Sequence, residues 1–61
     1  MNRYLVTIEG AGWQDVEELE LPTIPAEEDV IETKYGACLV LRAEPSPENE
    51  QYDGRIACRV P

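Results

Sequence analysis

The sequence contains no histidine, so it lacks the side chain that most often serves as a general base near neutral pH. A Ser–His–Asp triad is therefore excluded. The only serine, Ser46, stands between Pro45 and Pro47 in a polar stretch, and Lys34 is the only lysine. Paired carboxylates act as acid and base only where a cleft desolvates one of them, and a chain of 61 residues can barely bury a core. We therefore expect that the protein is not an enzyme.

Metal ligands are also scarce. Cys38 and Cys58 are the only cysteines, and without histidine they cannot complete a four-ligand zinc site within one chain. The consecutive acids at 27–29 lack the spacing of an EF-hand calcium loop, and neighbouring side chains on an extended chain point apart. We expect no metal and no other cofactor.

Long apolar runs are absent. No segment approaches the ~20 apolar residues of a membrane-spanning helix, and no apolar stretch behind a basic start indicates a signal peptide. We therefore expect a cytoplasmic protein, in which thiols stay reduced. The formal charge of −8 makes binding to nucleic-acid phosphates or to anionic lipids unfavourable, so neither is expected as a direct partner.

Basic residues are missing from one long stretch, and that stretch carries the net charge. Residues 15–32 contain eight of the thirteen acids and none of the five bases, so the remainder of the chain is neutral. A charge this concentrated predicts a negatively charged face on a small domain. The acids of the stretch are Asp15, Glu17, Glu18, Glu20, Glu27, Glu28, Asp29 and Glu32.

The length of the chain allows one domain, residues 1–61. Its hydrophobic fraction of 43% is that of a folded chain rather than a disordered one. The core of so small a domain supplies only about 3–5 kcal/mol of net stability. Formation of a homodimer would be a simple way to gain more.

Three segments have the composition and alternation of β-strands. Residues 2–9, 37–43 and 55–60 are rich in aliphatic and β-branched side chains that recur with period two. Gly10 and Gly12 end the first segment, and the pair Asp53-Gly54 forms a turn before the last. The second segment is the most apolar run in the chain, so we expect it to be a central strand.

Two further segments fit more than one structure. Residues 16–21 fit a strand or a short helix; their length and the preceding glycine turn favour a strand, which Pro22 ends. Residues 25–33 resemble the start of a helix, because acids occupy the first turn. The same stretch also fits a turn at 26–29 followed by a strand at 30–35, and its β-branched residues favour this second interpretation.

Four or five short strands, with a turn signal every eight to twelve residues or so, predict a mostly β fold. The expected architecture is a small curved antiparallel sheet or an SH3-like or OB-like barrel. The alternative is an antiparallel sheet with one short helix near residues 25–33.

The two cysteines fall on two of the expected strands, which the polar segment 44–54 connects. We expect a register in which Val40 faces Ile56 and Cys38 faces Cys58. Cysteine packs readily as a small buried hydrophobe, so core packing is favoured over a cross-strand disulfide.

Trp13 is the single tryptophan and follows the glycine turn. It fits either a buried plug at one end of a barrel or an exposed anchor for a partner, a role in which tryptophan is enriched. We expect Arg42, Arg55 and Arg59 to form salt bridges with the acidic stretch. The candidate partner-binding residues are Trp13 and the eight acids of residues 15–32.

These observations predict a small acidic binding module that docks on the basic surface of another protein, with charge complementarity raising the rate of association. Basic surfaces often bind nucleic acid, and an acidic domain can occupy such a surface in place of phosphates. In size and charge the chain resembles the DNA-mimic inhibitors of phages, including anti-CRISPR proteins.

The alternative is a structural or accessory subunit of a larger assembly, whose acids serve only solubility and whose apolar sheet face dimerises or docks on a larger protein. Salt would weaken association in the first case and leave it unchanged in the second.

Overall fold

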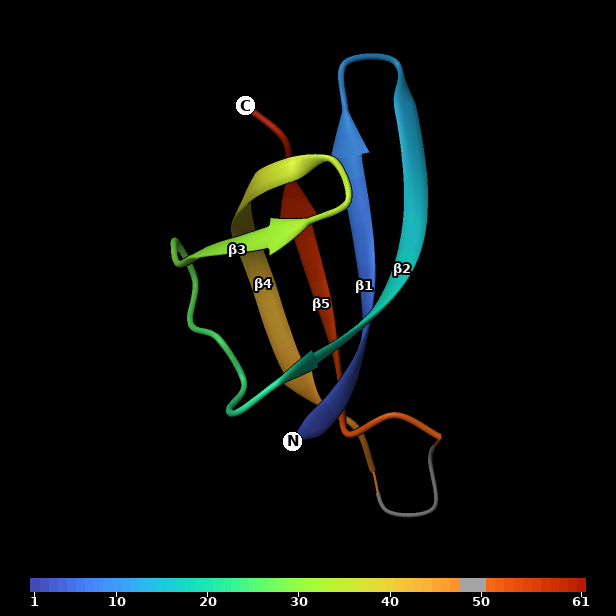
Figure 1. Ribbon diagram of the computed structural model, residues 1–61, viewed down its shortest axis with the longest axis vertical. Helices are drawn as coiled ribbons and strands as arrows, with labels where there is room; N and C mark the ends of the chain where they lie inside the picture. Colours follow the sequence, from blue (N-terminus) through green and yellow to red (C-terminus); the bar gives the residue numbers. More distant parts are fainter. Residues whose placement is uncertain (48–50) are drawn as a thin grey trace.

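The computed structural model describes residues 1–47 and 51–61, which form one five-stranded sheet curled into a half-barrel (Figure 1). The mostly β, curved-sheet prediction is confirmed, and the helix considered for residues 25–33 is wrong, because this stretch forms a loop with a turn and then a strand. No helix occurs in the two described ranges. The strands are β1 (Asn2–Gly10), β2 (Trp13–Leu21), β3 (Val30–Thr33), β4 (Gly36–Pro45) and β5 (Gly54–Arg59).

The strand order in the sheet is β2-β1-β5-β4-β3. Three neighbouring pairs are antiparallel, and β1 pairs with β5 in parallel. The central strand is therefore β5, whereas β4, which contains the most apolar run of the sequence, lies between β5 and the edge strand β3. The two edges of the sheet are β2 and β3.

The β1–β2 hairpin forms because glycine occupies both positions that need it. Gly10 pairs with Trp13 across a two-residue connection, Ala11-Gly12. Gly12 has a φ of 78°, which other residues rarely adopt. A Cβ atom on Gly10 would lie 2.3 Å from the indole of Trp13, so the missing side chain makes room for that ring. The strand predicted for residues 16–21 is confirmed and begins earlier, at Trp13.

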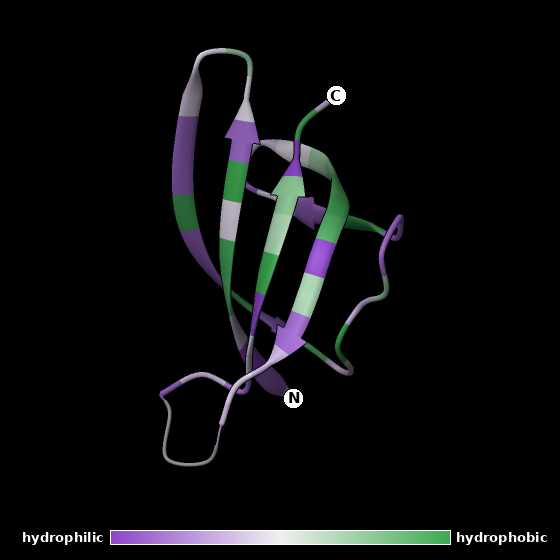
Figure 2. Ribbon diagram, turned by 180° about the vertical axis from the view of Figure 1, so that it is seen from behind, coloured by the Kyte–Doolittle hydropathy of each residue, from purple (hydrophilic) through white to green (hydrophobic). Residues whose placement is uncertain are grey.

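The core lies on the concave face of the sheet, where β1, β4 and β5 contribute buried residues at alternate positions and β3 contributes one. Figure 2 shows polar and apolar residues alternating along the upper part of β1, whereas the middle of β5 is apolar without interruption. Leu19 and Leu21 of β2 pack against this core from one edge. Its fully buried side chains include both thiols, which are free, so the prediction of core packing is confirmed. The buried residues are Tyr4, Val6, Ile8, Ile31, Cys38, Val40, Ile56 and Cys58.

The predicted register between the last two strands is wrong. Val40 lies opposite Cys58, and Ala43 lies opposite Ile56. The register shifts between Val40 and Arg42, which is the signature of a β-bulge that adds one residue to one strand. Both cysteines still point into the core, where Cys38 contacts Cys58 through its thiol rather than facing it across the ladder.

Residues 26–35 follow the turn-and-strand interpretation with a shorter strand than expected. The turn includes Glu28, which has a φ of 73°. Its amide donates to the carbonyl of Val40 at 2.8 Å, and the Val40 amide donates back to the Asp29 carbonyl at the same distance. The following strand, β3, ends at Thr33, so Lys34 and Tyr35 form the turn into β4.

Candidate interaction surface

The acids of residues 15–32 occupy the border of the sheet. Four belong to β2 and one to β3, the two edge strands, and three belong to the connection between those strands. We call this set the acidic rim: Asp15, Glu17, Glu18, Glu20, Glu27, Glu28, Asp29 and Glu32. Asp15 and Glu17 are half-buried, and the six others are exposed.

The sequence predicted a single negatively charged face, but the acids of β2 lie on both faces of the sheet. Side chains alternate along a strand, so Asp15 and Glu17 lie on the concave side with Leu19, and Glu18 and Glu20 lie on the convex side. The negative charge is therefore arranged along a border rather than on a flat face.

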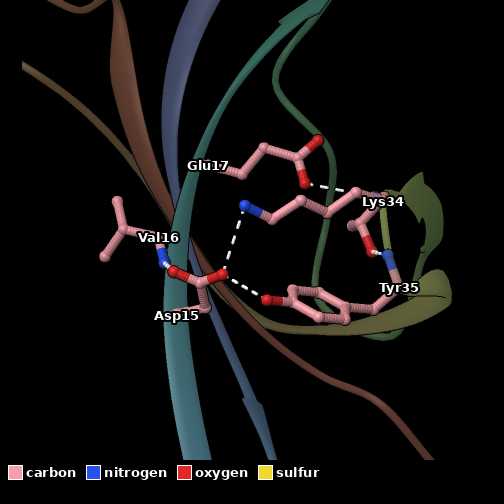
Figure 3. A network of polar contacts seen from close by, with 6 residues as sticks. Asp15, Val16, Glu17, Lys34 and Tyr35 are labelled. Carbon is pink, nitrogen blue, oxygen red and sulfur yellow. Dashed lines mark hydrogen bonds and ion pairs between the residues drawn. The ribbon is translucent and has the colours of Figure 1, made fainter.

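The turn between β3 and β4 reaches across to β2 and brings the two edges together (Figure 3). The ammonium of Lys34 lies 3.1 Å from Oδ2 of Asp15. The backbone amide of Lys34 donates to Oε2 of Glu17 at 3.1 Å. The hydroxyl of Tyr35 donates to the same Asp15 oxygen. We call Asp15, Glu17, Lys34 and Tyr35 the seam cluster, because these contacts join the β3–β4 turn to β2.

The contacts of the seam cluster shift the pKa of Asp15, Lys34 and Tyr35. The hydrogen bond from Tyr35, the Val16 amide and Lys34 together lower the pKa of Asp15 to about 2. The bond to Asp15 raises the pKa of Lys34, and it also raises the pKa of Tyr35 because the donated proton is held. At neutral pH Asp15 is therefore a carboxylate, Lys34 an ammonium and Tyr35 a neutral phenol.

Trp13 is neither buried nor isolated. It is the first residue of β2, with 39% of its surface exposed, so the interpretation as a buried plug is wrong. Its ring lies over Gly10, and its centroid is 4.6 Å from that of Tyr35 at an interplanar angle of 45°. The tryptophan is thus a partly exposed aromatic surface held next to the seam cluster.

Two further rim acids have local structural contacts. Glu18 accepts a hydrogen bond from the hydroxyl of Tyr52 at 2.9 Å, and Asp29 accepts one from the Ala26 amide at 2.9 Å. Within the described residues, the side chains of Glu20, Glu27 and Glu32 form no hydrogen bond or ion pair. Replacing these acids should therefore disturb the fold least.

The arginines lie away from the rim, on the interior strands β1, β4 and β5. Arg42 pairs with Glu44, and Arg59 pairs with Glu9, each at 3.4 Å. Neither acid belongs to residues 15–32, so the predicted bridges from these two arginines to the acidic stretch are wrong. Instead Lys34 contacts the rim, a role that the sequence did not reveal.

A hollow of about 480 Å³ lies over β1, β4 and β5 and extends to the start of β2. It lies outside the acidic rim. In the described part of the chain, no group of three or more potential metal ligands is close enough to hold an ion, and no helix is long and apolar enough to cross a membrane. The hollow is lined by Thr7, Glu9, Gln14, Leu41, Arg42, Ala57 and Cys58.

Comparison with family models, with curated proteins and with solved structures found no match to this chain.

Proposed function

We propose that the protein is a small acidic binding module whose acidic rim docks on a basic surface of another protein. The observation that carries this proposal is the segregation of charge by the fold. The rim acids lie on the two edge strands and their connection, whereas the arginines lie on the interior strands. Charged groups gathered along one border create a local field that a basic partner would meet first.

Two features of the rim suit it to binding. Glu20, Glu27 and Glu32 are exposed, so they can approach a partner without first breaking a contact within the described fold. Trp13 adds an aromatic surface beside Asp15, and tryptophan often supplies a large share of binding energy. Charge would then govern how fast the partners meet, and the aromatic contact how long they remain together.

The proposed partner is a cytoplasmic protein whose basic surface binds nucleic acid. The rim would occupy that surface in place of phosphates, which is how the DNA-mimic inhibitors of phages act. Those proteins resemble this chain in size and charge, and the proposal extends their mode of action to it.

A pair of charge-matched variants tests the proposal. E27Q/E32Q removes two rim carboxylates, and E9Q/E44Q removes two that pair with arginines outside the rim, so both raise the net charge by the same amount. Each is used to capture partners from a lysate of the native host at low and high salt. We expect E27Q/E32Q to slow association much more than E9Q/E44Q, and excess duplex DNA to release the partner. Equal kinetics for the two variants would contradict the proposal.

One observation favours a second candidate, an accessory subunit that docks through the convex face. Val30 is 64% exposed and lies opposite Leu39, which is 38% exposed, so the β3–β4 edge presents an apolar pair to solvent. In that case V30N/L39N would abolish association, salt would not affect it, and the rim variants would bind normally.

A further inference from the structure

β2 is a long edge strand, and among the residues that the structure describes no strand pairs with its outer side. It spans nine residues and pairs with β1 on one side only. In Figure 1 the upper part of β2 forms one margin of the molecule, and its lower part crosses the lower ends of β5 and β4 toward the connection to β3. Backbone groups along such an edge are able to pair with an extended segment from another chain.

The direction of the free backbone groups can be assigned from one contact. In an antiparallel pair, every second residue directs its N–H and C=O away from the neighbouring strand. The Val16 amide donates to Oδ1 of its neighbour Asp15 at 2.8 Å, so it points to the free edge. Glu18 and Glu20 have the same parity, and their backbone groups therefore point to that edge as well.

The side chains around this edge define what could pair with it. Glu18 and Glu20 lie on the convex side, and Leu19 and Leu21 lie half-buried on the concave side. Residues on adjacent strands lie within about 4.5–5.5 Å of each other on one face. A segment added here would place alternate side chains beside carboxylates and the others beside leucines.

We propose that the edge of β2 at residues 18–21 accepts an extended segment of the partner in which lysine or arginine alternates with apolar residues. This inference rests on the proposed function and specifies how the partner is held. Basic side chains would face Glu18 and Glu20, and apolar ones would extend the core beside Leu19. Backbone hydrogen bonds to β2 would fix the register of the added strand.

The charge on β2 argues against a second copy of this chain as the occupant. Pairing of two β2 strands would set the carboxylates of Glu18 and Glu20 against the acidic residues of an identical strand, and like charges directly opposite each other are destabilising. The same charges therefore oppose self-association and favour a basic segment. The other edge strand, β3, has only four residues and offers a shorter template.

Two synthetic peptides of equal composition test the inference on the unmodified protein. Both are blocked at their ends; one alternates lysine and valine over seven residues, and the other groups the valines together. We expect the alternating peptide to bind more tightly. We also expect it to slow hydrogen exchange at the amides of Glu18 and Glu20, measured by NMR, with little change at the Leu19 amide. Equal affinity for both peptides, without protection of those two amides, would overturn the inference.

A backbone variant supplies the second measurement. Glu20→Pro removes an amide that points to the free edge, and Glu20→Gln removes only the charge. Proline is tolerated in an edge strand where its nitrogen faces solvent. We expect E20P to bind the alternating peptide about two- to tenfold more weakly than E20Q, which corresponds to the loss of one backbone hydrogen bond. Equal affinities for two folded variants would contradict strand addition.

The two proposals can fail separately. If charge-dependent capture from lysate is confirmed and the alternating peptide leaves the amides of β2 unprotected, the acidic rim binds by another geometry and strand addition is wrong. If the alternating peptide adds to β2 but E27Q/E32Q captures partners as fast as E9Q/E44Q does, strand addition is supported and the rim-wide docking is wrong.

Discussion

The hydroxyl of Tyr35 donates a hydrogen bond to the carboxylate of Asp15, a residue twenty positions earlier in the chain. Asp15 lies on one edge strand of the sheet, and Tyr35 lies in the turn that follows the other. The contact thus ties the β3–β4 turn to β2 across the open side of the half-barrel (Figure 3).

Tyr35→Phe removes the hydroxyl and keeps the ring against Trp13. We expect a lower melting temperature, because the Asp15 carboxylate loses a donor and the turn loses a tie to β2. Tyr52→Phe is the matched control, since it removes a hydroxyl that donates to Glu18 on the convex side. Thermal unfolding followed by circular dichroism should show the larger decrease for Y35F; an equal decrease would mean that the seam has no special role.

The acid sensitivity of the fold should depend on Asp15. Its pKa is lowered to about 2 in the folded protein from its ordinary value of 3.8, so the folded state favours the charged form. This stabilisation is complete above the unfolded pKa and is lost as the pH falls through the folded one. Between pH 4 and pH 2 the wild type should therefore lose more stability than Asp15→Asn. Denaturant unfolding across that range measures the free energy of unfolding of both proteins. Parallel pH profiles would contradict the lowered pKa of Asp15.

The buried thiols should react slowly. Burial and the contact with Cys38 raise the pKa of Cys58 to about 12, so almost no thiolate forms at pH 8. We expect a thiol reagent to label neither cysteine rapidly until denaturant is added. The folded state favours the neutral thiol of Cys58, because its pKa is raised there. The contribution of this thiol to the stability of the fold is complete below its unfolded pKa and is lost as the pH rises towards 12. Rapid labelling of both thiols in the native protein would show that the core is open.

Replacing Gly10 or Gly12 by alanine should disturb the hairpin for a different physical reason in each case. A Cβ atom at Gly10 would meet the indole of Trp13 at 2.3 Å, whereas the space around Gly12 is open and only its backbone conformation is strained. G10A should displace the indole and alter tryptophan fluorescence. G12A should leave the fluorescence unchanged and lower stability by roughly 1 kcal/mol. Identical spectra for the two variants would be incompatible with the close contact at Gly10.

The two faces of the sheet should differ in their tolerance of truncation. Ile56 is 2% exposed at the centre of the core, and Leu41 is 42% exposed on the bulged segment of β4. Ile56→Ala should cost about 2–5 kcal/mol, which is comparable with the whole stability of so small a domain, and should leave the chain largely unfolded. Leu41→Ala should remain folded with a much smaller loss. Comparable urea midpoints would contradict the observed division into faces.

The strands were predictable because burial on one face leaves a period of two in the sequence, as at Tyr4, Val6 and Ile8. The pairing was not, because the same period fits any neighbour in either direction. Alternation does not specify that β1 lies beside β5 in parallel. The bulge after Val40 adds a residue that the apolar pattern does not reveal, so the register between β4 and β5 could not be predicted either.

The location of the charge was predictable, and its local chemistry was not. An excess of acids in residues 15–32 is visible in the sequence. The contacts of Asp15 depend on the curl of the sheet, which brings Lys34 and Tyr35 over β2. The one available signal was weak: the only lysine of the chain stands next to an aromatic residue just before Gly36, where a turn could present both.

The parallel pairing of β1 with β5 affects how the chain can fold during synthesis. β5 stands between β1 and β4, so without residues 54–59 the remaining strands could pair only as two separate hairpins, β1–β2 and β3–β4. No local turn can deliver a strand to a parallel neighbour so distant in sequence, and such non-local closure is slow. Folding must therefore wait for the last strand. In the meantime, the carboxylates of the middle of the chain would keep the unfinished polypeptide in solution by mutual repulsion between copies.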